Sequence, residues 1–150
     1  MARIKIEIPR QFSFYTSIPI RITDINYGAH VGNDSVLSLI HEARVRFLLH
    51  HGFKELELEG AGLLMSDVAI EFKAEIFYGD VIDISVGAGE FYRVGFDLYY
   101  RFEKEMDCKK TPVVIAKTGM VCYDYKTKKL VSVPQNVREK LSEEIITTNQ

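Results

Sequence analysis

Alternation of hydrophobic and polar residues dominates the start of the chain. Every second residue is apolar there, a period that predicts β-strands with one buried face. The residues that set this period are Ile4, Ile6, Ile8, Phe12, Phe14, Ile18, Ile20 and Ile22. Because proline cannot donate to a strand ladder, Pro19 predicts a sheet edge or a bulge at the end of this region.

The segment SVLSLIHEARVRFLLHHG, residues 35–52, changes to a spacing of three and four residues. This spacing predicts one amphipathic helix. Either Asn33 or Asp34 can cap its N-terminus, and Gly52 stands where a helix commonly ends in a left-handed residue. The apolar face consists of Val36, Leu39, Ile40, Ala43, Phe47 and Leu48, and a wider arc adds Leu37, Val45 and Leu49.

Four more alternating runs follow the helix, and the breaks between them are short. They predict strands at 65–77, 81–88, 94–102 and 114–122, with a charged hairpin loop at 103–112. A short C-terminal helix over 136–144 follows Pro134. Short connections favour antiparallel pairing, so we expect an α+β domain with one antiparallel sheet of about five strands. The exposed edges of such a sheet favour a homo-oligomer.

Composition and charge narrow the classes of function. A chain of 150 residues with 47% hydrophobic and 27% charged residues fits a single globular domain over 1–150. A net charge of -2 gives no basic surface for nucleic acid, and no apolar run reaches the roughly 20 residues of a membrane span. The N-terminus lacks the apolar core of a signal peptide. With only two cysteines, no disulfide framework is expected, and we predict a cytoplasmic protein.

The stretch TDINYGAHVGND, residues 23–34, gathers polar side chains and two glycines directly before the helix. A helix start offers unpaired backbone N–H groups and the positive end of the helix dipole. Gly32 lets a substrate approach the backbone closely. A well-capped helix start is the alternative, but a cap needs only one of these polar residues. The cluster therefore indicates a candidate site.

This stretch, continued as DINYGAHVGNDSVLSLIHEAR, resembles the D-x-D-x-x-G-H-V-N-N-x-x-Y…E-x-A-R signature of the 4-hydroxybenzoyl-CoA thioesterase-like family. The later segment IEFKAEIFYGDVIDISV resembles that family's second and third strands with their Gly-Asp turn. The resemblance covers roughly 18–123. It implies the hotdog fold, in which a sheet wraps a long central helix. It also implies hydrolysis of an acyl-CoA or acyl-carrier-protein thioester at a dimer interface.

The resemblance also implies roles for individual residues. The family's catalytic aspartate falls on Asn26, whose amide cannot take a proton at neutral pH. Its histidine falls on His30, and the residue whose backbone N–H polarises the thioester carbonyl falls on Asn33. The helix glutamate falls on Glu42, and a phosphate-binding arginine falls on Arg93. The family's first asparagine of H-V-N-N is replaced by Gly32.

With an amide at position 26, the base that activates water must be another residue. Asp34 is the carboxylate nearest the helix start, and it is either this base or a first-turn anion favoured by the dipole. Glu42 is either a base or the ion-pair partner of Arg46. His30 either acts on substrate or holds the loop through a backbone contact. Asn26 either orients water or substrate, or forms an Asx turn.

No metal ion or cofactor is expected. The sequence HEARV has Val45 where the second histidine of a zinc-binding H-E-x-x-H motif would stand. Two functions besides thioester hydrolysis remain open, namely a hotdog-type enoyl thioester hydratase or dehydratase and a non-catalytic acyl-thioester-binding oligomer. Asn26 in place of aspartate supports the second. The predicted assembly is a homodimer or homotetramer, and the acyl group is left open.

Overall fold

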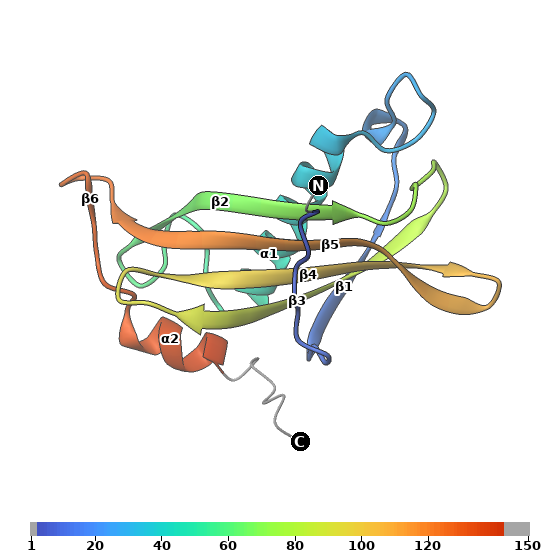
Figure 1. The fold of residues 1–150 in the computed structure, drawn as a ribbon. Coiled ribbons are helices and arrows are strands. Elements are labelled where there is room, and N and C mark those ends of the chain that lie inside the picture. The colour runs from blue at the N-terminus through green and yellow to red at the C-terminus, as the bar shows by residue number, and fades with distance from the viewer. Residues whose placement is uncertain (1–2, 143–150) are drawn as a thin grey trace.

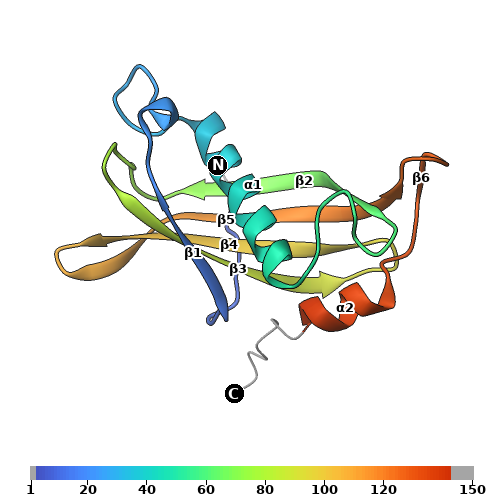
Figure 2. The same cartoon turned by 180° about the vertical axis from the view of Figure 1, so that it is seen from behind.

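The computed structural model describes residues 3–142 as an antiparallel sheet with a helix against one face (Figures 1 and 2). The strands run in the order β1-β3-β4-β5-β2, and the short β6 pairs with β5. This arrangement confirms the α+β class and the antiparallel sheet. The elements are β1 (Phe14–Pro19), the 3-10 helix η1 (Ile22–Asp24), α1 (Asn33–His50), β2 (Gly62–Phe72), β3 (Val81–Phe91), β4 (Gly95–Met106), β5 (Lys109–Asp124), β6 (Lys129–Leu130) and α2 (Gln135–Ser142).

The core lies between α1 and the sheet. One row of paired residues runs across the sheet, with Ile84 opposite Phe102, Phe102 opposite Val114, and Val114 opposite Phe72. The first three are buried in the core, whereas Phe72 at the edge strand is half exposed. Every residue predicted for the apolar face of the helix is buried in the 18-residue α1. Leu49 of the wider predicted arc is 53% exposed, so only the narrower face packs on the sheet of this chain.

The first predicted strand is wrong at its N-terminal end. Residues 3–13 form no strand, and they cross the face of the sheet opposite α1 (Figure 1). The Ile6 N–H donates to the Glu71 carboxylate rather than to a strand carbonyl. Alternation in the sequence shows only that a segment has one apolar and one polar face. To become a strand, the segment must also lie beside a sheet edge with unpaired backbone groups. The pairing starts only at Phe14, and Pro19 ends this edge strand as predicted.

Other strand boundaries shift as well, and the strand predicted at 81–88 is β3, which continues to Phe91. The predicted charged loop at 103–112 is mostly strand, because β4 and β5 pair as far as Met106 and Lys109. The turn is only Asp107-Cys108, both with positive φ, 51° and 65°. This conformation suits the tight turns that follow the strand twist. The strand predicted at 65–77 is β2, which begins at Gly62 and ends at Phe72, and the segment 73–80 leads into β3.

The predicted C-terminal helix is present as α2. It begins at Gln135, directly after Pro134, and its described part ends at Ser142. Val137 and Leu141 bury their side chains. The last two positions of the prediction, 143–144, lie outside the described residues.

Candidate active site

The start of α1 carries no side-chain cap, which corrects the predicted cap at Asn33 or Asp34. The helix begins at Asn33, and Gly32 occupies the N-cap position. The first helical bond runs from the Val36 N–H to the Gly32 carbonyl over 3.0 Å. The N–H groups of the first turn therefore have no partner inside the helix. They are available, together with the positive end of the dipole, to a polar group outside it.

The loop before the helix is closed by Asn26. Its side-chain Oδ1 accepts the Gly28 N–H over 2.8 Å, its carbonyl accepts the Ala29 N–H over 3.1 Å, and its N–H donates to the His30 carbonyl over 2.9 Å. Ala29 sits in the left-handed region with a φ of 67°. These contacts form the Asx turn that was one of the two alternatives for Asn26.

His30 follows this loop and faces the cavity described below. Its Nδ1 lies 3.1 Å from the Val31 carbonyl oxygen. A carbonyl oxygen only accepts, so Nδ1 carries the hydrogen and Nε2 of the neutral ring carries a lone pair. The loop-holding alternative for His30 is thus seen in the structure, and the same bond leaves Nε2 able to act on a ligand.

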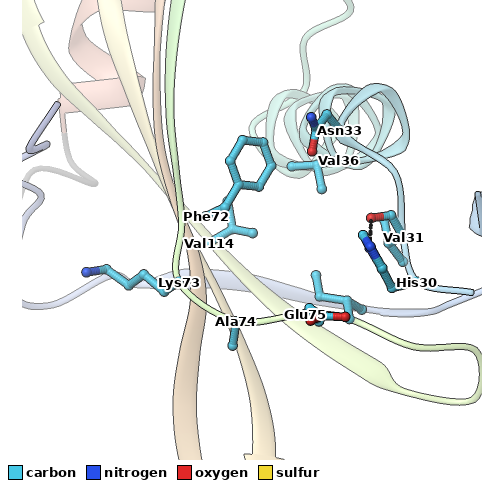
Figure 3. Close-up of a pocket in the computed structure, with 10 residues that line it drawn as sticks. His30, Val31, Asn33, Val36, Phe72, Lys73, Ala74, Glu75 and Val114 are labelled. Atoms are coloured by element: carbon cyan, nitrogen blue, oxygen red, sulfur yellow. Dashed lines mark hydrogen bonds between the residues drawn. The ribbon is translucent and has the colours of Figure 1, made fainter. Parts of the chain in front are cut away.

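A cavity of about 340 Å³ opens between the start of α1 and the segment that follows β2 (Figure 3). In Figure 3 the α1 side chains face Phe72 across it, and His30 and Glu75 lie at its lower edge. The walls combine apolar surface with a few polar groups, as ligand pockets generally do. The lining residues are His30, Val31, Asn33, Val36, Phe72, Lys73, Ala74, Glu75, Ile76 and Val114.

Gly32 and Asp34 lie together at the start of α1. Gly32 has an ordinary extended conformation, with a φ of -76°, so backbone freedom is not the reason for glycine. A Cβ there would approach Asp34 Oδ1 to 2.7 Å and the Asn26 Cβ to 3.4 Å. Glycine therefore allows the Asp34 carboxylate and the Asn26 side chain to flank the helix start closely.

Glu42 lies away from this cavity in the described chain. Its carboxylate accepts from Arg46 Nε over 2.8 Å, and its side chain is 52% exposed. Both residues line a different hollow of about 380 Å³, beside β1. The ion pair is the alternative that the four-residue spacing indicated.

Arg93 lies at the other end of the sheet. It sits in the turn between β3 and β4, where its Nη1 donates to Ser132 Oγ over 3.4 Å. Between Val114 at the cavity and Val121 beside that turn, β5 spans roughly 20 Å at about 3.3 Å per residue. Of the predicted site residues, only His30 and Asn33 line the cavity. Asn26, Gly32 and Asp34 lie together beside it at the start of α1, whereas Glu42 and Arg93 lie elsewhere in the chain.

Sequence reasoning missed the opposite wall of the cavity. Lys73, Ala74, Glu75 and Ile76 line it, and the alternation had placed them in a strand. The Ile76 carbonyl accepts the Val31 N–H over 2.8 Å, which joins this wall to the loop before α1. The break at Tyr78-Gly79-Asp80 set the predicted end of the strand, but it comes six residues after β2 ends at Phe72.

A buried polar network also went unnoticed, although Arg44 belongs to the quoted E-x-A-R motif. Arg44 is 6% exposed, and its Nε donates to Glu55 Oε1 over 2.6 Å. Its Nη1 also donates to the Tyr100 hydroxyl over 3.4 Å, and that hydroxyl lies 2.8 Å from Thr118 Oγ1. Burial raises the pKa of Tyr100, which stays protonated. The network ties α1 to the sheet.

Residues 3–142 contain no cluster of metal-ligating side chains and no membrane-spanning helix. No three histidine, cysteine, aspartate or glutamate side chains in this range gather as a metal site would require. No helix in the same range is long and apolar enough to cross a membrane.

Comparison with known proteins identifies the family. Residues 20–141 match the sequence model of the thioesterase-like superfamily, and the chain belongs to this superfamily. The resemblance to hotdog thioesterases is thereby confirmed. A putative esterase of Aquifex aeolicus is 28% identical over 115 residues, which cover 75% of this chain and 85% of the relative.

Solved structures share the fold. A hypothetical protein of Aquifex aeolicus superposes with a TM-score of 0.76 and 24% identity, over 85% of this chain and 98% of the other. A 1,4-dihydroxy-2-naphthoyl-CoA thioesterase of Synechocystis superposes with a TM-score of 0.77 and 17% identity, over 87% and 96%. At these identities the likeness shows the fold alone.

Proposed function

We propose that this protein is an acyl-CoA thioesterase, which hydrolyses an acyl thioester to a free acid and CoA. The observation that carries the proposal is the start of α1. An uncapped helix N-terminus opens beside a cavity that also contains His30 and an apolar wall. Membership in the thioesterase-like superfamily supports hydrolysis as the reaction.

In this proposal the thioester carbonyl oxygen accepts hydrogen bonds from the first-turn N–H groups of α1, beginning with Asn33. Water attacks the carbonyl carbon, and the resulting oxyanion is stabilised by the same N–H groups and the helix dipole. Collapse of this intermediate breaks the C–S bond, and the CoA thiolate takes up a proton. Loss of one such donor typically costs about 100- to 1000-fold in rate.

The base that removes the proton from water is assigned first to Asp34. It lies in the first turn of α1, close to Gly32, whereas Glu42 is paired with Arg46 in the other hollow. Glu42 is retained as the second candidate. His30 orients water or substrate through Nε2, and Asn26 holds the loop in which His30 stands.

The acyl group stays open in this proposal, because a second copy of the chain would add its own residues to the walls of the cavity. Aromatic, short aliphatic and long aliphatic thioesters all belong in a substrate panel, including the aromatic thioester named for the Synechocystis protein. CoA and acyl-carrier protein are both candidate carriers.

We also propose a cytoplasmic homodimer or homotetramer. Within residues 3–142, the edge strands β1 and β2 each pair with a neighbouring strand on one side only, which favours pairing with another copy. A contact between Arg93 and a CoA phosphate is proposed only for an assembly in which a second copy brings its Arg93 to this cavity.

The test is release of free CoA from aromatic and C2 to C18 acyl-CoAs, followed with a thiol reagent. Turnover supports the thioesterase. Water addition to an enoyl-CoA without thiol release would instead indicate a hydratase. A raised melting temperature with acyl-CoA and no turnover would indicate the non-catalytic binder, a reading that Asn26 in its Asx turn favours.

A further inference from the structure

The row of core-facing residues on β4 ends in a lysine. Phe96, Leu98, Tyr100 and Phe102 alternate along the strand and are fully buried. Lys104 continues the same alternation toward the hairpin and is only 9% exposed. Lysine is almost never buried unless its charge is paired, so its partners need an explanation.

All partners of Lys104 lie in the segment 73–80 that joins β2 to β3. Its Nζ donates to the Glu75 carbonyl over 2.8 Å and to Asp80 Oδ2 over 3.0 Å. The same ammonium lies 5.0 Å from the centre of the Phe77 ring, within range of a cation–π contact. One buried cation therefore contacts three residues in the second half of this segment. The first half is held by β5, because the Lys73 and Ala74 N–H groups donate to the Val113 carbonyl over 2.9 and 3.3 Å.

Asp80 links Lys104 to further residues through its own hydrogen bonds. Its Oδ2 also accepts the Phe77 N–H over 2.8 Å, its N–H donates to the Phe77 carbonyl over 3.1 Å, and its carbonyl accepts the Ile20 N–H over 2.9 Å. The carbonyl of Ile76, the residue directly before this closed turn, accepts the Val31 N–H over 2.8 Å. The chain of contacts thus reaches from Lys104 to the residue next to His30.

We propose that Lys104 is a positioning residue for the candidate active site, where it fixes the part of the cavity wall formed by Glu75 and Ile76. The proposal rests on the proposed function only in its kinetic consequence. Lys104 does not line the cavity, so it acts on a ligand through Glu75 and Ile76 rather than by contact. Supports of this kind decide whether a site keeps its geometry.

The direct test is amide hydrogen exchange in Lys104→Met, which keeps much of the apolar stem and removes the charge. We expect the Phe77, Asp80 and Val31 amides to exchange about ten- to a hundred-fold faster, since bonds to charged groups are among the strongest in proteins. Amides in the middle of β4 and β5 should keep their protection.

The kinetic test follows KM and kcat with an acyl-CoA that the wild type hydrolyses. A displaced wall weakens substrate and transition state equally, so KM should rise about five-fold or more while kcat stays within about two-fold. Lys104→Arg keeps the charge and should restore most of both readouts. Asp80→Asn can still accept the Phe77 N–H, but it lacks the carboxylate charge and should resemble Lys104→Met.

Lys110→Met is the matched control. Lys110 lines the same hollow as Lys104 but contacts Asp83 rather than the segment 73–80, and its side chain is 54% exposed. This variant should leave KM and the three amides unchanged. Equal effects in both variants, or a uniform loss of protection throughout Lys104→Met, would overturn the positioning role.

The two proposals fail in different ways. If the wild type hydrolyses no acyl-CoA, the proposed function fails, and local exchange in Lys104→Met still decides whether the wall is anchored. If the wild type is active and Lys104→Met changes exchange without changing KM, the wall is anchored but does not position substrate, and the inference is wrong.

Discussion

His30 donates its Nδ1–H to the carbonyl of Val31, the next residue, over 3.1 Å. This bond fixes one tautomer and leaves a lone pair on Nε2. One substitution separates the roles of the two ring nitrogens, because an asparagine amide can reproduce the Nδ1 donor but not the Nε2 lone pair. The ring can therefore hold the loop and act on a ligand at the same time.

His30→Asn should keep the loop bond and lower kcat by about 100-fold, the lower end of the usual range for a proton-handling or orienting side chain. Its melting temperature should stay close to that of the wild type. Steady-state kinetics and thermal unfolding measure both. Full activity in this variant would mean that His30 only holds the loop.

The two candidate bases give opposite expectations. Asp34→Asn should lower kcat about 100-fold or more, because an amide cannot accept the proton from water. Glu42→Gln should keep the rate within about three-fold and cost about 0.5 kcal/mol or less of stability, since an exposed i,i+4 pair contributes little. The same kinetic assay on both variants decides the assignment. A large loss of activity in Glu42→Gln with little change in Asp34→Asn would assign the base to Glu42. Full activity in both variants would show that neither residue is the base.

Gly32→Ala tests the close packing at the helix start. The new Cβ would meet the Asp34 carboxylate at 2.7 Å, and this exposed side chain can turn away. The φ of -76° suits alanine, so stability should change by less than about 1 kcal/mol. Activity should fall with the displaced carboxylate. An unchanged kcat would show that the position of Asp34 is irrelevant to the reaction.

Tyr100→Phe should destabilise the fold by about 1–3 kcal/mol, because it leaves the buried Thr118 hydroxyl without its 2.8 Å partner. Urea unfolding measures this loss. Tyr15→Phe is the control, since Tyr15 is 65% exposed, and its cost should stay within about 0.5 kcal/mol. Equal stabilities of the two variants would show that the network adds nothing to folding.

The two cysteines should differ in reactivity. Cys108 is exposed in the β4–β5 turn, whereas burial raises the pKa of the fully buried Cys122 to about 11. Near pH 8 the Cys122 thiol therefore stays protonated and covered. A thiol reagent should react with one cysteine per native chain and with both in denaturant. Fast reaction of both in the native protein would contradict this burial.

The site could be located from sequence because its residues are consecutive. The polar stretch from Asn26 to Asp34 lies in one loop and the first turn of a strongly periodic helix, so the chain itself holds these residues together. The opposite wall could not be found this way. Ala74 and Ile76 continue the alternation of β2, although the pairing with β5 ends at Phe72 and the Glu75 carbonyl accepts from Lys104 on a distant strand.

The same reason explains the error at the N-terminus. Ile4, Ile6 and Ile8 have the period of a strand, but no sheet edge is beside them. At the β4–β5 hairpin the error is the reverse, because a loop was predicted where the chain forms strands. Charged side chains there indicated a loop, yet backbone pairing continues to Met106 because both faces of the hairpin end can be solvated. Side-chain polarity indicates which residues are buried. It does not determine strand pairing, which depends on whether another backbone segment lies alongside.

The most direct test of the central claim compares two substitutions at one position that lines the cavity. Asn33→Ala leaves the backbone N–H in place, whereas Asn33→Trp fills the space in front of it. CoA release should be nearly unchanged in the first and at least about ten-fold lower in the second, because productive placement of the thioester is lost. Cys108→Ser can serve as the background to lower the thiol signal of the protein. Unchanged CoA release in Asn33→Trp, or none from the wild type with any acyl-CoA, would contradict the account.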